Sequence, residues 1–227
     1  MRTIYSYIVY IILLLQLNSC NNEGLMYEYE HSTPIKFSSS CINVSTKSQG
    51  IIENNKLPKG SNISIFSIQH PENTTINLWE PILFDNIKGI SNFNGDIEYN
   101  NTYYFPDKEQ LDFFAIYPFL SFPTIGSDYG NTQYTTVTLK DNTVDQYDLM
   151  YASLLNQSKK SSVLVFEFHH LLTQITINII KNTGVTIDLP LTKVQIVAPQ
   201  SATLDIWHGQ LSDIAGQTTY TLDTNTT

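Results

Sequence analysis

Apolar and polar residues alternate with a period of two along much of this chain, most clearly between residues 163 and 180. In the first half of this block, every second residue is aliphatic, aromatic or histidine: Leu164, Phe166, Phe168, His170 and Leu172. In an extended strand these side chains share one face. The second half moves the apolar residues to the other parity, at Ile175, Ile177 and Ile179. A regular strand cannot change face, so the pattern predicts a β-bulge or a break near residues 172–174.

A helix is the competing interpretation of this block, because some of its leucines and isoleucines also fit a helical stripe. The β-branched and aromatic residues favour a strand. Further strands are predicted, from alternation or β-favouring composition, at 35–37 (extending towards 44), 63–68, 82–84, 111–117, 134–139, 185–189, 194–198, 203–207 and 220–222. The segment 111–117 is apolar at both parities, as expected of a strand that is covered on both faces. Short strands separated by turns, with no sustained helical period, predict an all-β fold, specifically a β-sandwich.

The first twenty residues have the pattern of an export signal. Arg2 provides a positive charge, residues 8–15 are apolar, and Leu17-Asn18-Ser19-Cys20 resembles a bacterial lipobox. The sequence therefore predicts a lipoprotein signal peptide at 1–19, lipidation of Cys20, and a flexible polar tether at 20–34. Ordinary cleavage near Ser19 and an uncleaved signal anchor are the alternatives.

Composition narrows the class of protein further. The net charge is −9, which argues against a nucleic-acid partner, because phosphate binding needs a basic surface. Few charges and many Tyr, Phe, Ile, Thr and Asn are typical of a β-rich exported protein. After lipidation of Cys20, only Cys41 remains, so no disulfide within the chain is expected. We expect Cys41 to be a partly buried small side chain.

Candidate catalytic or metal-binding residues are few. His169 and His170 are adjacent, so in a strand they point to opposite faces and cannot readily chelate one ion. We expect His170 to be a packed, hydrogen-bonded histidine, and no metal is expected at either position. The other histidines show no ligand spacing: His31, His70 and His208, all in expected loops. Asp145 and Asp148 are expected to cap a turn, with loose calcium binding as the weaker alternative, and Asp205 and Asp213 form no defensible carboxylate pair. Without a nucleophile elbow, a phosphate-binding glycine loop or a Cys–His cluster, no enzyme and no cofactor are expected.

Two segments carry a resemblance to a known family. The first is Tyr103-Tyr104-Phe105-Pro106, followed by Leu111-Asp112-Phe113-Phe114-Ala115-Ile116-Tyr117-Pro118; the second is Asp148-Leu149-Met150-Tyr151-Ala152, a polar loop, and Phe166-Glu167-Phe168-His169-His170-Leu171-Leu172. Their order and spacing resemble the fimbrillins, the type V pilins and pilus-accessory lipoproteins of Bacteroidales. The extra Phe105 before the proline departs from the family's pattern. The resemblance covers about residues 57 to 180.

The resemblance implies a transthyretin-like β-sandwich, with residues 35–184 as the first domain of a family that has two. Residues 185–227 would then be its final strands or the start of a truncated second domain. The implied function is that of a pilus subunit or accessory component in adhesion, at the outer membrane and cell surface. Its implied partners are other pilus subunits, the membrane through the lipid, and a host or bacterial surface ligand.

Fimbrillins also imply a processing step in which a protease removes the first strand and a strand of the next subunit replaces it. Arg2 is the only arginine, so an arginine-specific cut after the first strand is not possible. Lys47 is the candidate processing site among the lysines of the following loop, Lys47, Lys56 and Lys59.

The alternative function is a non-polymerising surface lipoprotein that binds glycan or protein ligands. Aromatic platforms would then come from Trp79, Tyr99, Tyr103, Tyr129 or Trp207, although most of these are expected in the core or in turns. An accessory domain of a secreted hydrolase is a third, weaker option.

Overall fold

The computed structural model describes residues 33–41, 55–120, 133–141, 146–159, 163–175, 177, 180, 184 and 191–223. These residues form ten strands, and no helix is found among them. The part of the chain described here therefore contains no helix of the length and apolarity that crossing a bilayer requires. The prediction of an all-β fold is confirmed.

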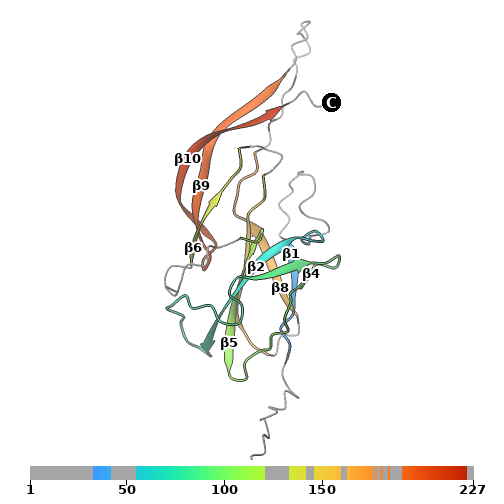
Figure 1. The fold of residues 1–227 in the computed structure, drawn as a ribbon, viewed down its shortest axis with the longest axis vertical. Coiled ribbons are helices and arrows are strands. Elements are labelled where there is room, and N and C mark those ends of the chain that lie inside the picture. Colours follow the sequence, from blue (N-terminus) through green and yellow to red (C-terminus); the bar gives the residue numbers. More distant parts are fainter. Residues whose placement is uncertain are drawn as a thin grey trace, which may run out of the picture. The chain divides into compact units, whose positions relative to one another are not determined.

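Seven of the strands form a closed barrel (Figure 1). Their order around it is β1-β4-β3-β2-β5-β7-β8. Their bounds are β1 Phe37–Cys41, β2 Asn62–Pro71, β3 Ile87–Ser91, β4 Asp96–Glu98, β5 Glu109–Tyr117, β7 Met150–Gln157 and β8 Leu164–His170. All neighbours are antiparallel except β1 and β8, which run parallel from the pair Phe37–Leu164 to the pair Cys41–Phe168.

The closure corrects the prediction of a transthyretin-like β-sandwich. β1 pairs with β8 on one side and with β4 on the other, so it joins strands that would be the edges of an open sheet. Side-chain alternation predicts which residues face a core, but it is the same for a sandwich and a barrel. The alternation of side chains could therefore not predict that the sheet closes into a barrel.

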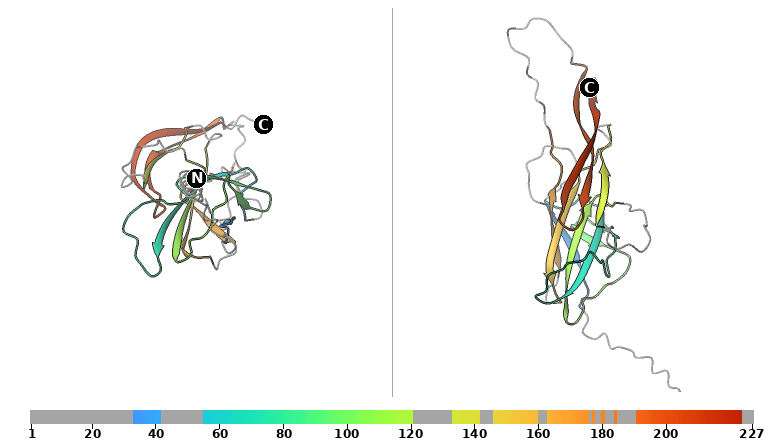
Figure 2. Two further views of the ribbon diagram at one scale, coloured as in Figure 1. Left: turned by 60° about the horizontal axis from the view of Figure 1, so that its bottom comes forward. Right: turned by 90° about the vertical axis from the view of Figure 1, so that its left-hand side faces the viewer.

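The remaining strands form a three-stranded antiparallel sheet in the order β10-β9-β6 (Figure 2). Their bounds are β6 Tyr134–Thr138, β9 Lys193–Asp205 and β10 Gln210–Asp223. The segments predicted at 194–198 and 203–207 belong largely to the single strand β9, and the short strand predicted at 220–222 is the end of β10. β6 comes from the range predicted for the first domain, yet it pairs with β9.

Two hydrophobic cores share the barrel wall between them. The barrel interior is centred on Phe37, whose ring lies 4.8 Å from that of Phe166 and 5.0 Å from that of Phe113. The second core lies outside the barrel, where Phe114 and Ile116 of β5 pack with Trp79 and with residues of β6 and β9. β5 therefore buries both parities, as its sequence predicted.

Other sequence predictions are refined by the structure. Leu164, Phe166 and Phe168 are buried on one face of β8, and the strand ends at His170, next to the predicted break. β7 extends through Gln157, so the polar loop expected between residues 152 and 166 begins after that residue. The segment 82–84 is not a strand as predicted: its backbone hydrogen-bonds Ser67 of β2, with Phe84 buried and Ile82 exposed.

Candidate functional site: an apolar groove beside a free strand edge

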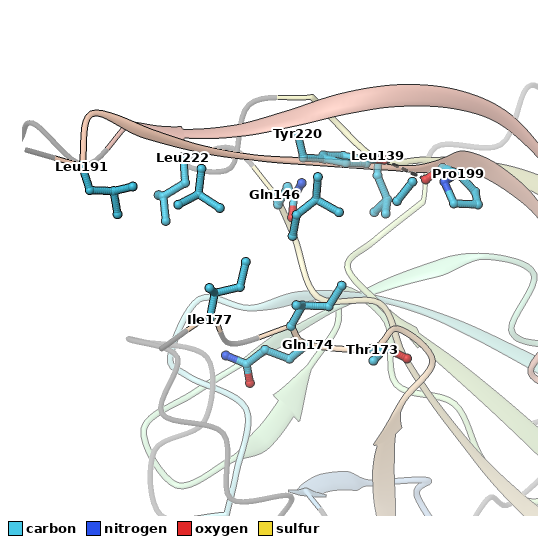
Figure 3. A pocket seen from close by; sticks show the side chains of 13 residues that line it. Leu139, Gln146, Thr173, Gln174, Ile177, Leu191, Pro199, Tyr220 and Leu222 are labelled. Atoms are coloured by element: carbon cyan, nitrogen blue, oxygen red, sulfur yellow. Dashed lines mark hydrogen bonds between the residues drawn. The ribbon is translucent and has the colours of Figure 1, made fainter. Parts of the chain in front are cut away.

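A groove of about 550 Å³ opens between the β9–β10 sheet and the segment that follows β8. Figure 3 shows Leu191, Tyr220 and Leu222 on one side, with Thr173, Gln174 and Ile177 facing them across the gap. Most of the remaining lining is aliphatic, including Val194, Ile196 and Ala198 of β9. The groove is thus a long apolar surface between two extended segments.

The alternation of β9 explains why one wall of this groove is apolar. Val194, Ile196 and Ala198 share a parity and line the groove, and all three are half-buried. Val197, which points to the opposite face, is 65% exposed. The groove face of β9 is therefore partly covered by the chain itself, while the other face is open to solvent.

Among the described residues, one edge of β9 is paired over only part of its length. β10 pairs with β9 along its whole length, from Lys193 to Asp205. On the other side, β6 pairs only from Ser201 to Asp205, and the Leu139 amide donates one further hydrogen bond to the Gln200 carbonyl. Within the described ranges, no strand pairs with this edge between Lys193 and Pro199. Backbone donors and acceptors of an unpaired edge are a template for another strand.

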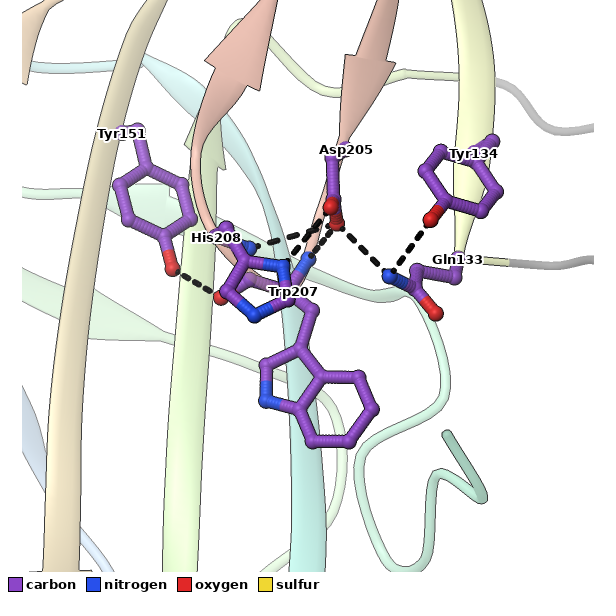
Figure 4. A network of polar contacts seen from close by, with 6 residues as sticks. All are labelled: Gln133, Tyr134, Tyr151, Asp205, Trp207 and His208. Atoms are coloured by element: carbon purple, nitrogen blue, oxygen red, sulfur yellow. Dashed lines mark hydrogen bonds and ion pairs between the residues drawn. The ribbon is translucent and has the colours of Figure 1, made fainter. Parts of the chain in front are cut away.

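The turn between β9 and β10 fixes the base of this sheet to the barrel (Figure 4). The Tyr151 hydroxyl of β7 donates a hydrogen bond of 2.7 Å to the Trp207 carbonyl. Gly209 has φ +62° and lies so close to the Tyr151 ring that a Cβ would be 2.3 Å from it. Only glycine fits this contact without a shift of the ring or the turn.

The structure places His170 and Asp148 together, which the sequence did not predict. His170 Nδ1 lies 2.5 Å from Asp148 Oδ2, and both side chains are mostly buried. Burial raises the pKa of Asp148, while the charge of His170 and its hydrogen bond lower it. His170 is therefore packed and hydrogen-bonded, whereas Asp148 pairs with it instead of capping a turn. His169 lies on the other side of the strand against the Tyr151 ring.

Cys41 ends β1 inside the barrel and is buried. Burial, reinforced by the negative charge of Asp148, raises the pKa of its thiol to about 11. A thiol of this kind is a poor nucleophile at neutral pH, because the thiolate is the reactive form. Cys41 is therefore a packing residue.

The remaining candidate residues are dispersed. His70 is at the end of β2, not in a loop as predicted, and contacts Asp112. Asp205 accepts hydrogen bonds from the β9–β10 turn, while Asp213 lies in β10.

Among the aromatic candidates, Trp79 is buried in the second core, and Tyr99 and Tyr103 pack against the first. Among the described residues, no three His, Cys, Asp or Glu side chains are grouped as metal ligands would be. Cys20, His31, Lys47, Tyr129 and Asp145 lie outside the described residues.

Comparisons with known proteins agree on a family and a fold. A family described as fimbrillin-like matches residues 47–227. Among solved structures, a candidate cell adhesion protein of Bacteroides uniformis is 22% identical, with a TM-score of 0.57 over 86% of this chain and 72% of its own.

Two further solved structures are similar. A candidate cell adhesion protein of Bacteroides ovatus has a TM-score of 0.53 at 15% identity, covering 85% of this chain and 77% of its own. A fimbrial protein of Bacteroides vulgatus has a TM-score of 0.50 at 17% identity, covering 83% and 64%. No curated protein sequence matches the chain significantly.

Proposed function

This chain belongs to the fimbrillin-like family, and from that premise we propose that it is a lipid-anchored subunit or accessory component of adhesive pili, joined to other subunits by β-strand exchange. The family and the fimbrial and adhesion proteins of similar fold support a pilus-related protein of the cell surface. The lipid anchor and the strand exchange go beyond what these similarities support and are argued separately below.

The observation that carries the proposal is an apolar groove beside the part of the β9 edge to which no strand of the described ranges pairs. A strand from a second subunit would pair with the backbone of residues 193–199, and its alternate side chains would enter the groove. The apolar residues of the groove face, spaced two apart, match the period of such a strand. Because both backbone pairing and apolar burial are supplied, the groove suits a β-strand better than a small polar ligand.

Processing after β1 is a second element of the proposal. A cut at Lys47 would leave β1 held to the rest of the fold by noncovalent contacts alone, chiefly its pairing with β8 and β4 and the packing of Phe37. Loss of β1 would open the barrel between β4 and β8 and uncover the Phe37 site, a second place where a strand could insert. Replacement of Lys47 by glutamine should then prevent conversion to the shorter form by a lysine-specific protease, as N-terminal sequencing would show.

Lipidation at Cys20 would hold the protein at the outer membrane until a cut at Lys47 separated the subunit from its lipid. Acyl chains contribute about 0.8 kcal/mol per buried methylene, so several chains give lasting attachment. Cys20→Ala should release the protein from the membrane fraction of cells that express the full chain. If the variant stayed in that fraction, the lipid anchor would be refuted.

The groove is tested with two substitutions on adjacent residues of β9. Ile196→Asp places a charge on the groove face, whereas the control Val197→Asp places it on the exposed face. The proposal predicts a ladder of subunit complexes after protease treatment of the wild type. We expect Ile196→Asp to abolish this ladder and Val197→Asp to preserve it. Both variants should unfold within about 1 kcal/mol of the wild type, since neither residue is fully buried. Equal ladders for both variants would exclude this groove as the acceptor.

A further inference from the structure

A second cavity, of about 480 Å³, lies between β5, β7, the loop after β2 and the β9–β10 turn. Its volume is typical of sites for small ligands. Its lining differs from that of the groove because most of it is polar or aromatic, and no residue lines both. The principal lining residues are His70, Asp112, Ser153, Asn156, Trp207 and His208.

A fixed carboxylate lies on the β5 side of this cavity. Asp112 is only 7% exposed, and its Oδ1 accepts a hydrogen bond of 2.6 Å from the Asn156 amide N–H. The same oxygen is 3.2 Å from His70 Nε2, while His70 Nδ1 is 3.0 Å from the Pro71 carbonyl oxygen. Both acceptor atoms are oxygens, so in each of these contacts the imidazole N–H is the donor when a hydrogen bond forms. The Asp112 carboxyl group is thereby held in place with one oxygen already occupied.

A stacked pair of aromatic rings, Trp207 and His208, also lines the cavity, and Figure 4 shows the two residues. The His208 ring lies on the Trp207 indole, with ring centres 5.5 Å apart and planes inclined by 20°. Asp205 fixes the stack: it accepts hydrogen bonds from the Trp207 and His208 amides and lies 2.7 Å from His208 Nδ1. Since Nδ1 is used by Asp205, Nε2 is the nitrogen that a ligand would meet.

We propose that this cavity binds a neutral sugar at the end of a glycan. A pyranose ring has an apolar C–H face that packs on a flat aromatic surface, and hydroxyls around its edge that both donate and accept. The cavity offers the matching groups: the Trp207–His208 stack, a carboxylate that accepts, and the carboxamide of Asn156, which does both. No lysine or arginine lines it, and its two histidines already contact carboxyl groups of the protein, so the cavity favours a neutral sugar over an acidic one.

The position of Asn156 allows a sharp test. Its φ is +57°, a conformation that glycine adopts without strain. Asn156→Gly therefore removes the side-chain carboxamide but keeps the hydrogen bond from the backbone amide to Asp112. Asn73 has φ +60° and does not line the cavity, which makes Asn73→Gly the matched control. His208→Ala removes the outer ring of the stack. The His208 side chain is more than half exposed.

The full chain is applied to immobilised oligosaccharides that end in neutral hexose or N-acetylhexosamine, with sialylated and sulfated ones as counter-probes. The best neutral binder is then measured by calorimetry. We expect Asn156→Gly and His208→Ala each to weaken binding about tenfold, and Asn73→Gly to leave it unchanged. Ile196→Asp should bind the sugar normally, which separates this site from strand exchange.

Three outcomes would overturn the proposal. The first is that no neutral probe binds the wild type, and the second is that only charged probes bind. In the third, Asn156→Gly and His208→Ala bind as tightly as the wild type while their thermal unfolding is unchanged.

Discussion

The barrel and the β6–β9–β10 sheet are built from the same alternation of side chains but treat their edges in opposite ways. In the barrel, β1 joins β4 and β8, so the sheet closes and Phe37 is buried at its centre. In the three-stranded sheet, the described strands pair with only one side of β9 between Lys193 and Pro199, and its groove face is half-covered. Closure stabilises a fold, whereas an open edge above an apolar surface is suited to a partner strand. We therefore expect the barrel to supply most of the stability of the fold, and the β9 edge to be the first place where a partner strand would pair.

The largest effect should come from a truncation inside the barrel. Phe37→Ala removes a fully buried ring that contacts the aromatic residues of several other strands, and we expect it to cost about 4 kcal/mol of unfolding free energy. Urea unfolding measures this change. Phe93→Ala is the control, because the Phe93 ring is 82% exposed and its loss should cost less than about 0.5 kcal/mol. Equal losses in the two variants would contradict the barrel as the source of stability.

A smaller effect is expected at the junction of the two regions. Gly209→Ala combines a positive φ with a Cβ that would be 2.3 Å from the Tyr151 ring, and we expect a loss of about 3 kcal/mol. Gly60→Ala has a similar φ of +83° but meets no atom within 4 Å, so it should cost only about 1 kcal/mol. Tryptophan fluorescence follows the junction, since Trp79 and Trp207 both lie there. If the two alanine variants were equally stable, the contact with Tyr151 would not hold the sheet.

The smallest effect is a pH dependence at the end of β8. Burial raises the pKa of Asp148 above its ordinary value of 3.8, so the folded state holds this proton more tightly than the unfolded state. The free energy of unfolding should therefore fall as the pH rises from about 3.8 through the folded pKa. Asp148→Asn should flatten that part of the profile in urea titrations. Asp107→Asn, at a side chain that is 86% exposed, serves as the control and should leave the profile unchanged.

Much of the strand content could be predicted from local pattern. Leu164, Phe166 and Phe168 share a buried face as their spacing requires, and β5 is covered on both sides as its composition predicted. The groove was less accessible to sequence reasoning. Val194, Ile196 and Ala198 were recognised as an alternating strand, but nothing in their spacing showed that one edge would lack a neighbour.

The polar pairs were missed for the same reason. His70 and Asp112 are 42 residues apart in sequence, and their contact depends on the pairing of β2 with β5. Asp148 and His170 meet because β7 lies beside β8. The sequence of β8 did carry one signal of such a pair. His170 has the same parity as the buried Leu164, Phe166 and Phe168, so its imidazole needed a hydrogen-bond partner inside the fold.

The sequence by itself determined that this chain is made of strands, which residues of each strand share a face, and to which family it belongs. The tertiary structure decided that β1 closes a barrel, that β6 pairs with a strand about 60 residues later, and that part of one β9 edge has no neighbour among the described strands. The physical reason is the period of two in an extended chain. It assigns each side chain to one of two faces, whereas the neighbour of each strand depends on long-range pairing and on the burial that this pairing achieves.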